Sequence, residues 1–204
     1  MQRLLLTLGL ASVLHAMELL PAQPEELVGK WHILLWMGSP IIPGLMMTSP
    51  PPPQMTHSLP PFWMELSKEG LMIKVKLRQP SGHCEEMKTT LWKTDDPTKF
   101  MADRALPPEK QQAVHIWATR MKMYYIMHTQ EKMKDKTMHM TMLIGPTMEK
   151  KPEAVKMFQE FVESEGMDKA RVMAPSPTGN DRRLRLPYFQ RGAAPPDPCM
   201  AHHR

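Results

Sequence analysis

Apolar and charged residues alternate strictly in part of this chain, and few structures accommodate that pattern. In residues 71–78 one face carries Leu71, Ile73, Val75 and Leu77. The residues between them are mostly charged, so the run predicts a β-strand with one buried and one wet face. In residues 84–93 the corresponding face carries Met87, Thr89 and Leu91. The two runs predict an antiparallel hairpin.

Further short strands are expected, separated by turns. The predicted ranges are residues 27–36, 99–102, 113–119, 124–129, 137–144 and 172–174. Residues 38–61 are rich in proline, which cannot donate a hydrogen bond to a sheet, so we expect a long loop there. About eight strands in chain order favour an up-and-down barrel, because closing the sheet removes its exposed edges.

One helix is expected at about residues 149–165. Pro152 suits its first turn, and apolar residues recur at helical spacing until Gly166. Its apolar stripe must pack on another element, and the outside of the sheet is the available surface. The fold class is therefore predicted to be all-β, an eight-stranded antiparallel barrel with one C-terminal helix.

The two ends of the chain differ from its middle. Residues 1–16 combine a basic residue, Arg3, with a short apolar run and Ala16, which is typical of a signal peptide; the alternative is a buried helix. No stretch reaches the roughly 20 apolar residues of a membrane span. We therefore expect a secreted, extracellular protein, with a barrel at 17–176 and a flexible Pro- and Arg-rich tail at 177–204.

Charge and cysteine content limit the function classes. The net charge of +5 is modest and partly lies in the tail, so we expect no nucleic-acid surface. Cys84 and Cys199 are the two cysteines, and in an exported protein they either form a disulfide or remain free thiols. We expect no enzyme and no cofactor, because the chain carries no hydrolase, metalloprotease or phosphate-loop motif.

Several short motifs, in order along the chain, resemble the lipocalin family. They are Gly29-Lys30-Trp31, the segment Gly82 to Glu86, the turn Lys93 to Pro97 and Leu143-Ile144-Gly145 before the helix. The resemblance covers roughly residues 25–175. It implies that Gly29 and Trp31 begin the first strand, with Trp31 closing one end of the barrel. It also implies a disulfide between Cys84 and Cys199.

The resemblance and the alternation together predict the residues that face a ligand cavity. These are Ile73, Val75, Leu77, Met87, Thr89, Leu91, Val114, Ile116, Met127 and Met140. Such a lining favours a small hydrophobic molecule of the lipid, retinoid or odorant class, and methionine adapts to ligand shape. The alternative is that the same side chains fill the barrel completely.

Two functions follow from those alternatives. The first is a secreted carrier of a small hydrophobic molecule, with a cavity of several hundred cubic ångströms. The second is a secreted interaction protein with a filled barrel, which engages a protein partner through its Pro-rich loop and basic tail. The run Met138 to Met142 carries soft metal ligands, but alternation puts its methionines and His139 on opposite faces, so no metal site is predicted.

Overall fold

The computed structural model describes residues 19–38, 60–78, 83–102, 111–133 and 136–175, together with Cys199. The expected signal peptide at residues 1–16 lies outside this part of the chain. So do residues 39–59 of the expected proline-rich loop and, apart from Cys199, the expected tail at 177–204. Those three expectations stay predictions.

Within these residues the chain forms mostly β-strands. In chain order the elements are β1 (Leu20–Pro21), the 3-10 helix η1 (Pro24–Leu27), β2 (Gly29–Gly38), β3 (Phe62–Ser67), β4 (Gly70–Arg78), β5 (Cys84–Lys93), β6 (Lys99–Ala102), β7 (Gln112–Ala118), β8 (Tyr125–Met133), β9 (Lys136–Gly145), the helix α1 (Pro152–Ser164) and the 3-10 helix η4 (Lys169–Arg171).

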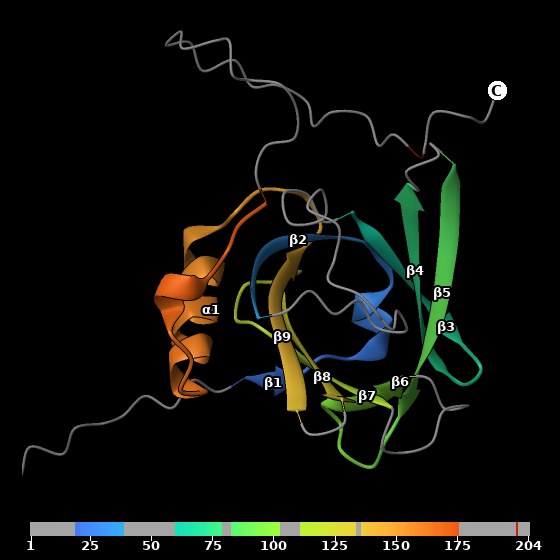
Figure 1. The fold of residues 1–204 in the computed structure, drawn as a ribbon, viewed down its shortest axis with the longest axis horizontal. Coiled ribbons are helices and arrows are strands. Elements are labelled where there is room, and N and C mark those ends of the chain that lie inside the picture. Colours follow the sequence, from blue (N-terminus) through green and yellow to red (C-terminus); the bar gives the residue numbers. More distant parts are fainter. Residues whose placement is uncertain are drawn as a thin grey trace, which may run out of the picture.

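Strands β2 to β9 form a closed antiparallel barrel (Figure 1). Each of these strands pairs with the next one in the sequence, and β9 pairs back onto β2 to close the ring. The short β1 pairs with the C-terminal part of β7, through Leu20 and Ala118. The predicted eight-stranded up-and-down barrel with one C-terminal helix is confirmed.

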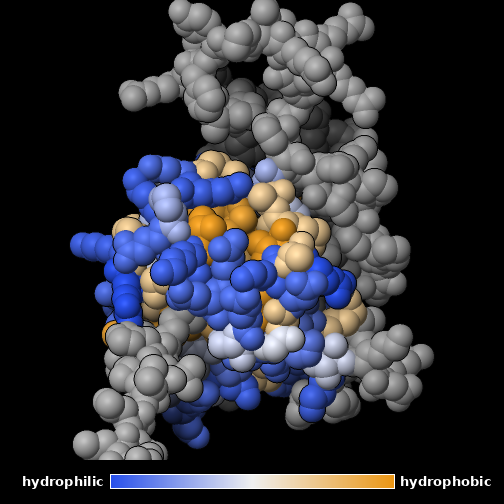
Figure 2. Space-filling view, turned by 90° about the vertical axis from the view of Figure 1, so that its left-hand side faces the viewer, coloured by the Kyte–Doolittle hydropathy of each residue, from blue (hydrophilic) through white to orange (hydrophobic). Residues whose placement is uncertain are grey.

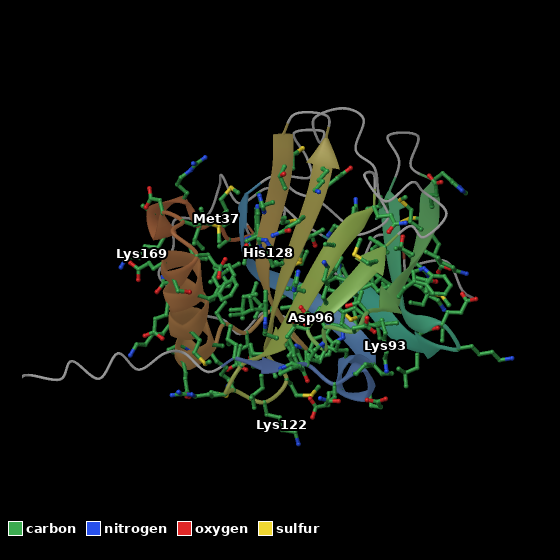
Figure 3. The ribbon with its side chains drawn as sticks, turned by 90° about the horizontal axis from the view of Figure 1, so that it is seen from below. Met37, Lys93, Asp96, Lys122, His128 and Lys169 are labelled. Carbon is green, nitrogen blue, oxygen red and sulfur yellow. A yellow bond between two sulfur atoms is a disulfide. The ribbon has the colours of Figure 1, made fainter. Side chains whose placement is uncertain are left out.

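The antiparallel order places the connections at two ends of the barrel. The C-terminal ends of β2, β4, β6 and β8 lie at one end, which we call the loop end. The other end, which we call the base, carries the remaining turns between strands. One of them is the predicted turn at residues 95–97, where Thr98 donates hydrogen bonds to the Asp96 carboxylate from its backbone N–H (2.8 Å) and its hydroxyl (2.7 Å) (Figure 3).

One strand was not predicted and one strand prediction is wrong. Residues 62–67, for which no element was predicted, form β3 between β2 and β4. Residues 172–174 were expected to be a strand, but only Met173 pairs, in an isolated bridge with Trp36. The backbone N–H of Trp36 donates to Met173 O at 2.9 Å, and the backbone N–H of Met173 donates to Trp36 O at 2.8 Å.

The apolar side chains form two layers, one inside the barrel and one between the barrel and α1. The outer layer joins the outward faces of β2, β8 and β9 to Ala154, Phe158, Phe161 and Val162 of the helix. The prediction that the helix packs on the outside of the sheet is confirmed (Figure 1). The opposite face of the helix meets solvent, and Figure 2 shows mostly hydrophilic residues over this side of the molecule.

Helix α1 has the expected signals at both ends. Pro152 occupies its first turn, and its missing N–H costs nothing there because that group has no partner within a helix. Gly166 follows the last turn with φ of +71°, a conformation that glycine adopts without strain. The N–H of Gly166 donates to Glu163 O and that of Met167 to Val162 O, which is a Schellman motif.

Candidate functional site

The residues predicted to face a cavity lie on the inner side of the barrel. Those buried in the interior cluster are Ile73, Val75, Leu77, Leu91, Val114, Ile116, Met127 and Met140. Met87 is half-buried and packs against that cluster. Thr89, also half-buried, is on the same face of β5 and lies opposite Ile73 in the register. Their position is established, and their contact with a ligand stays a prediction.

Sequence reasoning missed part of this interior. The omitted members include Ile33, Trp36, Phe62, Met64, Phe100, Tyr125, Met142 and Ile144. For Phe62 and Met64 the signal was alternation in a short strand beside prolines. For Met142 it was the same alternation that singled out Met140. Ile33 and Trp36 lie three positions apart because β2 has an irregular register between Ile33 and Leu35, which reverses the alternation.

A small cavity lies among the residues of the interior. Its volume is about 20 Å³, and it is lined by Ile33, Pro60, Phe62, Ile73, Val75, Met127 and Met142. Three of the predicted residues, Ile73, Val75 and Met127, are among them. This space holds about one water molecule, and its lining is apolar, so it is not a water site. The described interior is therefore much fuller than the several hundred cubic ångströms expected of a carrier.

Methionines make up much of what fills the barrel. The interior cluster includes Met64, Met127, Met140 and Met142, and Met87 and Met138 pack against it. Met127 and Met142 lie opposite each other in the β8–β9 register and both border the cavity. Because methionine is unbranched and has three rotatable bonds, such a lining can change shape at small cost.

A polar group lies inside the barrel on the loop-end side of the cavity. Gln112 and Glu131 are buried and directly opposite each other, and the Gln112 side-chain amide donates to the Glu131 carboxylate at 3.3 Å. Thr129 is fully buried on the same inward face of β8. The Thr129 hydroxyl has no hydrogen-bond partner among the described residues.

The base of the barrel is closed by Trp31. Its side chain is 1% exposed, and its indole N–H donates to Leu27 O of η1 at 2.7 Å. Tyr125 meets the indole edge-on, with 5.2 Å between ring centroids, and its hydroxyl donates to Glu26 O at 3.4 Å. Burial raises the pKa of Tyr125. The position of Gly29 and Trp31 at the start of the first barrel strand is as predicted.

A disulfide joins Cys84 to Cys199, with 5.7 Å between their Cα atoms. It links the loop end of β5 to a residue 115 positions further along the chain. Closing a loop of that length lowers the entropy of the unfolded chain, which corresponds to about 5 kcal/mol of stability. The predicted pairing is therefore confirmed.

Three histidines lie on the outer face of β7, β8 and β9. His128 is buried beneath this surface, with its Nδ1 2.7 Å from the Thr141 hydroxyl and its Nε2 3.4 Å from His139 Nδ1. His115 lies opposite His128 in the β7–β8 register. Burial lowers the pKa of His128 to about 4, and the nearby His139 and His115 act in the same direction. His128 lies on the wall beside α1 (Figure 3).

No group of three metal-ligating side chains that could hold an ion occurs among the residues that the structure describes. In the same part of the chain no helix is long and apolar enough to cross a membrane. A larger depression of about 590 Å³ lies on the outside of the barrel, lined by Lys68, Glu69, Trp92, Lys93, Met101 and Gln111. It is open to solvent and partly polar, so it is a poor match for an apolar ligand.

Comparison with known proteins gives consistent results. Residues 47–179 match the sequence model of the Lipocalin / cytosolic fatty-acid binding protein family. Lipocalin-1 of Sus scrofa is 27% identical over 164 residues, which cover 79% of this chain and 85% of the relative. Major allergen Can f 1 of Canis lupus familiaris is 26% identical over 173 residues, or 82% and 90% of the two chains. The solution NMR structure of lipocalin 12 from rat epididymis is 15% identical and superimposes with a TM-score of 0.60, over 79% of this chain and 89% of that one.

Proposed function

Since the chain belongs to the lipocalin and cytosolic fatty-acid-binding protein family, we propose that it binds a small hydrophobic molecule inside the barrel and carries it outside the cell. The observation that carries this proposal is the inner face itself. It is a mostly apolar surface, with a void bordered by Met127 and Met142. An apolar ligand gains free energy by leaving water for such a surface.

The void of about 20 Å³ means that the ligand must displace side chains. Met127 and Met142 are the side chains that can move most readily, because they are long and unbranched. Met140 and Met64 are further methionines buried inside the barrel, which can also change conformation. The proposed site is therefore adaptable and selects ligands more by size than by shape.

The second candidate function is a secreted interaction protein with a filled barrel. The observation that favours it is the same small void, which is far below the roughly 300 Å³ of a small ligand pocket. The proline-rich segment and basic tail that would meet a partner lie outside the described residues. The two candidates differ in whether the interior admits a guest.

Binding of an uncharged fluorescent probe, N-phenyl-1-naphthylamine, separates the two candidates. Trp31 and Trp36 lie inside the barrel, whereas Trp117 packs beneath the helix. We expect saturable probe binding with quenching of Trp emission, and less quenching in Trp36→Phe. A folded protein that binds no probe would support the filled-barrel candidate.

Two substitutions at the void test the location with opposite signs. Ile73→Phe fills the void and should weaken probe binding at least tenfold, while Met142→Ala enlarges it and should tighten binding. Met142→Ala should also cost about 2–5 kcal/mol of stability, part of which the ligand restores. Met72→Phe is the control for Ile73→Phe, because Met72 is the adjacent residue on the outer face of β4. Equal binding by Ile73→Phe and Met72→Phe would place the probe elsewhere.

Transport outside the cell rests on residues 1–16 acting as a signal peptide. The disulfide between Cys84 and Cys199 supports it, because such bonds persist in oxidising compartments. Expression of the full chain in cultured animal cells tests it. We expect the protein in the medium with a new N-terminus near residue 17, and retention of the intact chain in the cytosol would contradict export.

A further inference from the structure

Thr129 is a polar residue on an inner face that is mostly apolar. Its side chain is fully buried, yet among the described residues its hydroxyl has no hydrogen-bond partner. A hydroxyl both donates and accepts, and burying one without a partner costs free energy. Valine has nearly the same shape and would avoid that cost. A threonine at this position is therefore explained if its partner is a molecule that enters the barrel.

Thr129 lies on the inward face of β8, next to the residues that line the void. It follows Met127 on the inward face of β8, and Met127 borders the void. Alternate residues of a strand lie about 7 Å apart, so Thr129 is one layer of side chains nearer the loop end. Its neighbours in the register are Val114 and Met140, both apolar and fully buried.

A second polar group lies one step further along β8. The Glu131 carboxylate is 6% exposed and accepts a hydrogen bond from the Gln112 amide at 3.3 Å. A carboxylate only accepts hydrogen bonds and is strongly hydrated in water. Bringing one to Thr129, beside the acceptor oxygens of Glu131, therefore costs more free energy than bringing an uncharged hydroxyl. The described lining thus has an apolar body and a polar end next to a carboxylate.

We propose that the ligand of this barrel is an amphipathic alcohol, an apolar chain or ring system that ends in a hydroxyl group bound by Thr129. The inference rests on the proposed function, because it requires a ligand inside the barrel. The hydroxyl of the ligand donates to Thr129 Oγ1, which an ether cannot do, and its apolar body takes the space of the void and the adjoining methionines. Thr129 then selects among ligands of equal length by their end group.

Competition against N-phenyl-1-naphthylamine tests this selection with four molecules built on a twelve-carbon chain. They are 1-dodecanol, its methyl ether, dodecanoate and dodecylamine, which share one chain and differ only at the end. A single uncharged hydrogen bond corresponds to roughly a twofold to tenfold difference in affinity. We expect 1-dodecanol to bind about fivefold more tightly than the ether, and dodecanoate to bind most weakly.

Substitution of Thr129 connects that preference to its hydroxyl. Thr129→Val should remove the difference between alcohol and ether, without lowering the melting temperature, because valine keeps the shape and lacks the buried hydroxyl. Thr129→Ser should retain the preference. Thr90→Val is the matched control, because Thr90 is half-buried on the outer face of β5. That control should leave the order of affinities unchanged.

The outcomes separate this inference from the proposed function. Displacement of the probe by all four molecules with equal affinity overturns the inference and leaves ligand binding established. So does tighter binding of dodecylamine or dodecanoate than of 1-dodecanol, or an unchanged preference in Thr129→Val. A folded wild-type protein that binds neither probe nor alcohol overturns both.

Discussion

The two sides of the barrel have similar inner faces and different outer faces. On the wall of β2, β8 and β9, which we call the helix-covered wall, outward residues such as Leu34, Ile126 and Leu143 are fully buried beneath α1. On the wall of β3, β4 and β5, the solvent-facing wall, outward residues include Lys74 and Lys88. The helix-covered wall therefore packs against apolar residues on both faces, whereas the solvent-facing wall does so only on its inner face.

The difference between the two walls is visible in the sequence, because the number of buried faces of a strand decides its pattern of apolar residues. A strand between two apolar layers becomes a continuous apolar run, as in Ile33 to Trp36. A strand with one wet face keeps its alternation, as in residues 71–77. The helix-covered wall should accordingly lose more stability when its outer contacts are removed.

The largest expected effect comes from removing the central contact of the helix. Phe158 is fully buried between α1 and the barrel. Phe158→Ala should lower the free energy of unfolding by about 3–5 kcal/mol, because it removes a buried ring and leaves a cavity. Urea denaturation followed by circular dichroism measures the change. Lys88→Ala, on the outer face of the other wall, is the control and should stay within about 0.5 kcal/mol. Equal effects of the two substitutions would refute the contrast between the walls.

Acid should weaken the helix-covered wall through His128. The folded pKa of about 4 lies below the ordinary value of 6.5. As pH falls from 6.5 to 4, the unfolded chain gains a proton at His128 that the folded chain does not, so the stability present above pH 6.5 is lost. A shift of that size corresponds to about 3 kcal/mol.

Denaturation of wild type and His128→Gln at pH 7 and pH 4.5 isolates that contribution, because other titrating groups are shared. The wild type should lose more stability than the variant over this interval. Identical losses would show that burial of His128 does not disfavour its charged form.

The smallest effect is expected on the solvent-facing wall. The Lys74 ammonium and the Glu65 carboxylate lie 2.6 Å apart on neighbouring strands, and both side chains contact water. A double-mutant cycle with Lys74→Met and Glu65→Gln should give a coupling of about 0.2–1 kcal/mol. The coupling should shrink as salt is added. A value above 2 kcal/mol would mean that this pair is as important as the buried contacts of the other wall.

The same contrast explains what could be predicted from the sequence. Alternation in residues 71–77 assigned the inner face of β4 correctly, because its outer face is wet. Strand β3 was missed because it is short, follows prolines directly, and buries only Phe62 and Met64 among its six residues. The second half of β2 was assigned as a strand, but its inward residues could not be identified across the irregular register after Ile33.

The candidate site was predictable only in part. Alternation predicted the inward position of Ile73, Val75 and Met127. The size of the void was not predictable, because it depends on the side-chain rotamers of the methionines, which a sequence does not specify. The predicted strands at 113–119 and 124–129 did not include Gln112 and Glu131. In the fold both strands continue, and these residues are buried.

The bridge between Trp36 and Met173 bears on how the protein resists aggregation. Strand β3 pairs with only the first three residues of β2, Gly29 to Trp31, so the edge of β2 beyond them is not covered by β3. Met173 pairs with β2 at Trp36, on that edge. Uncovered strand edges are the places where separate chains join into larger assemblies. The short segment after the helix therefore also shields the barrel from other copies of itself.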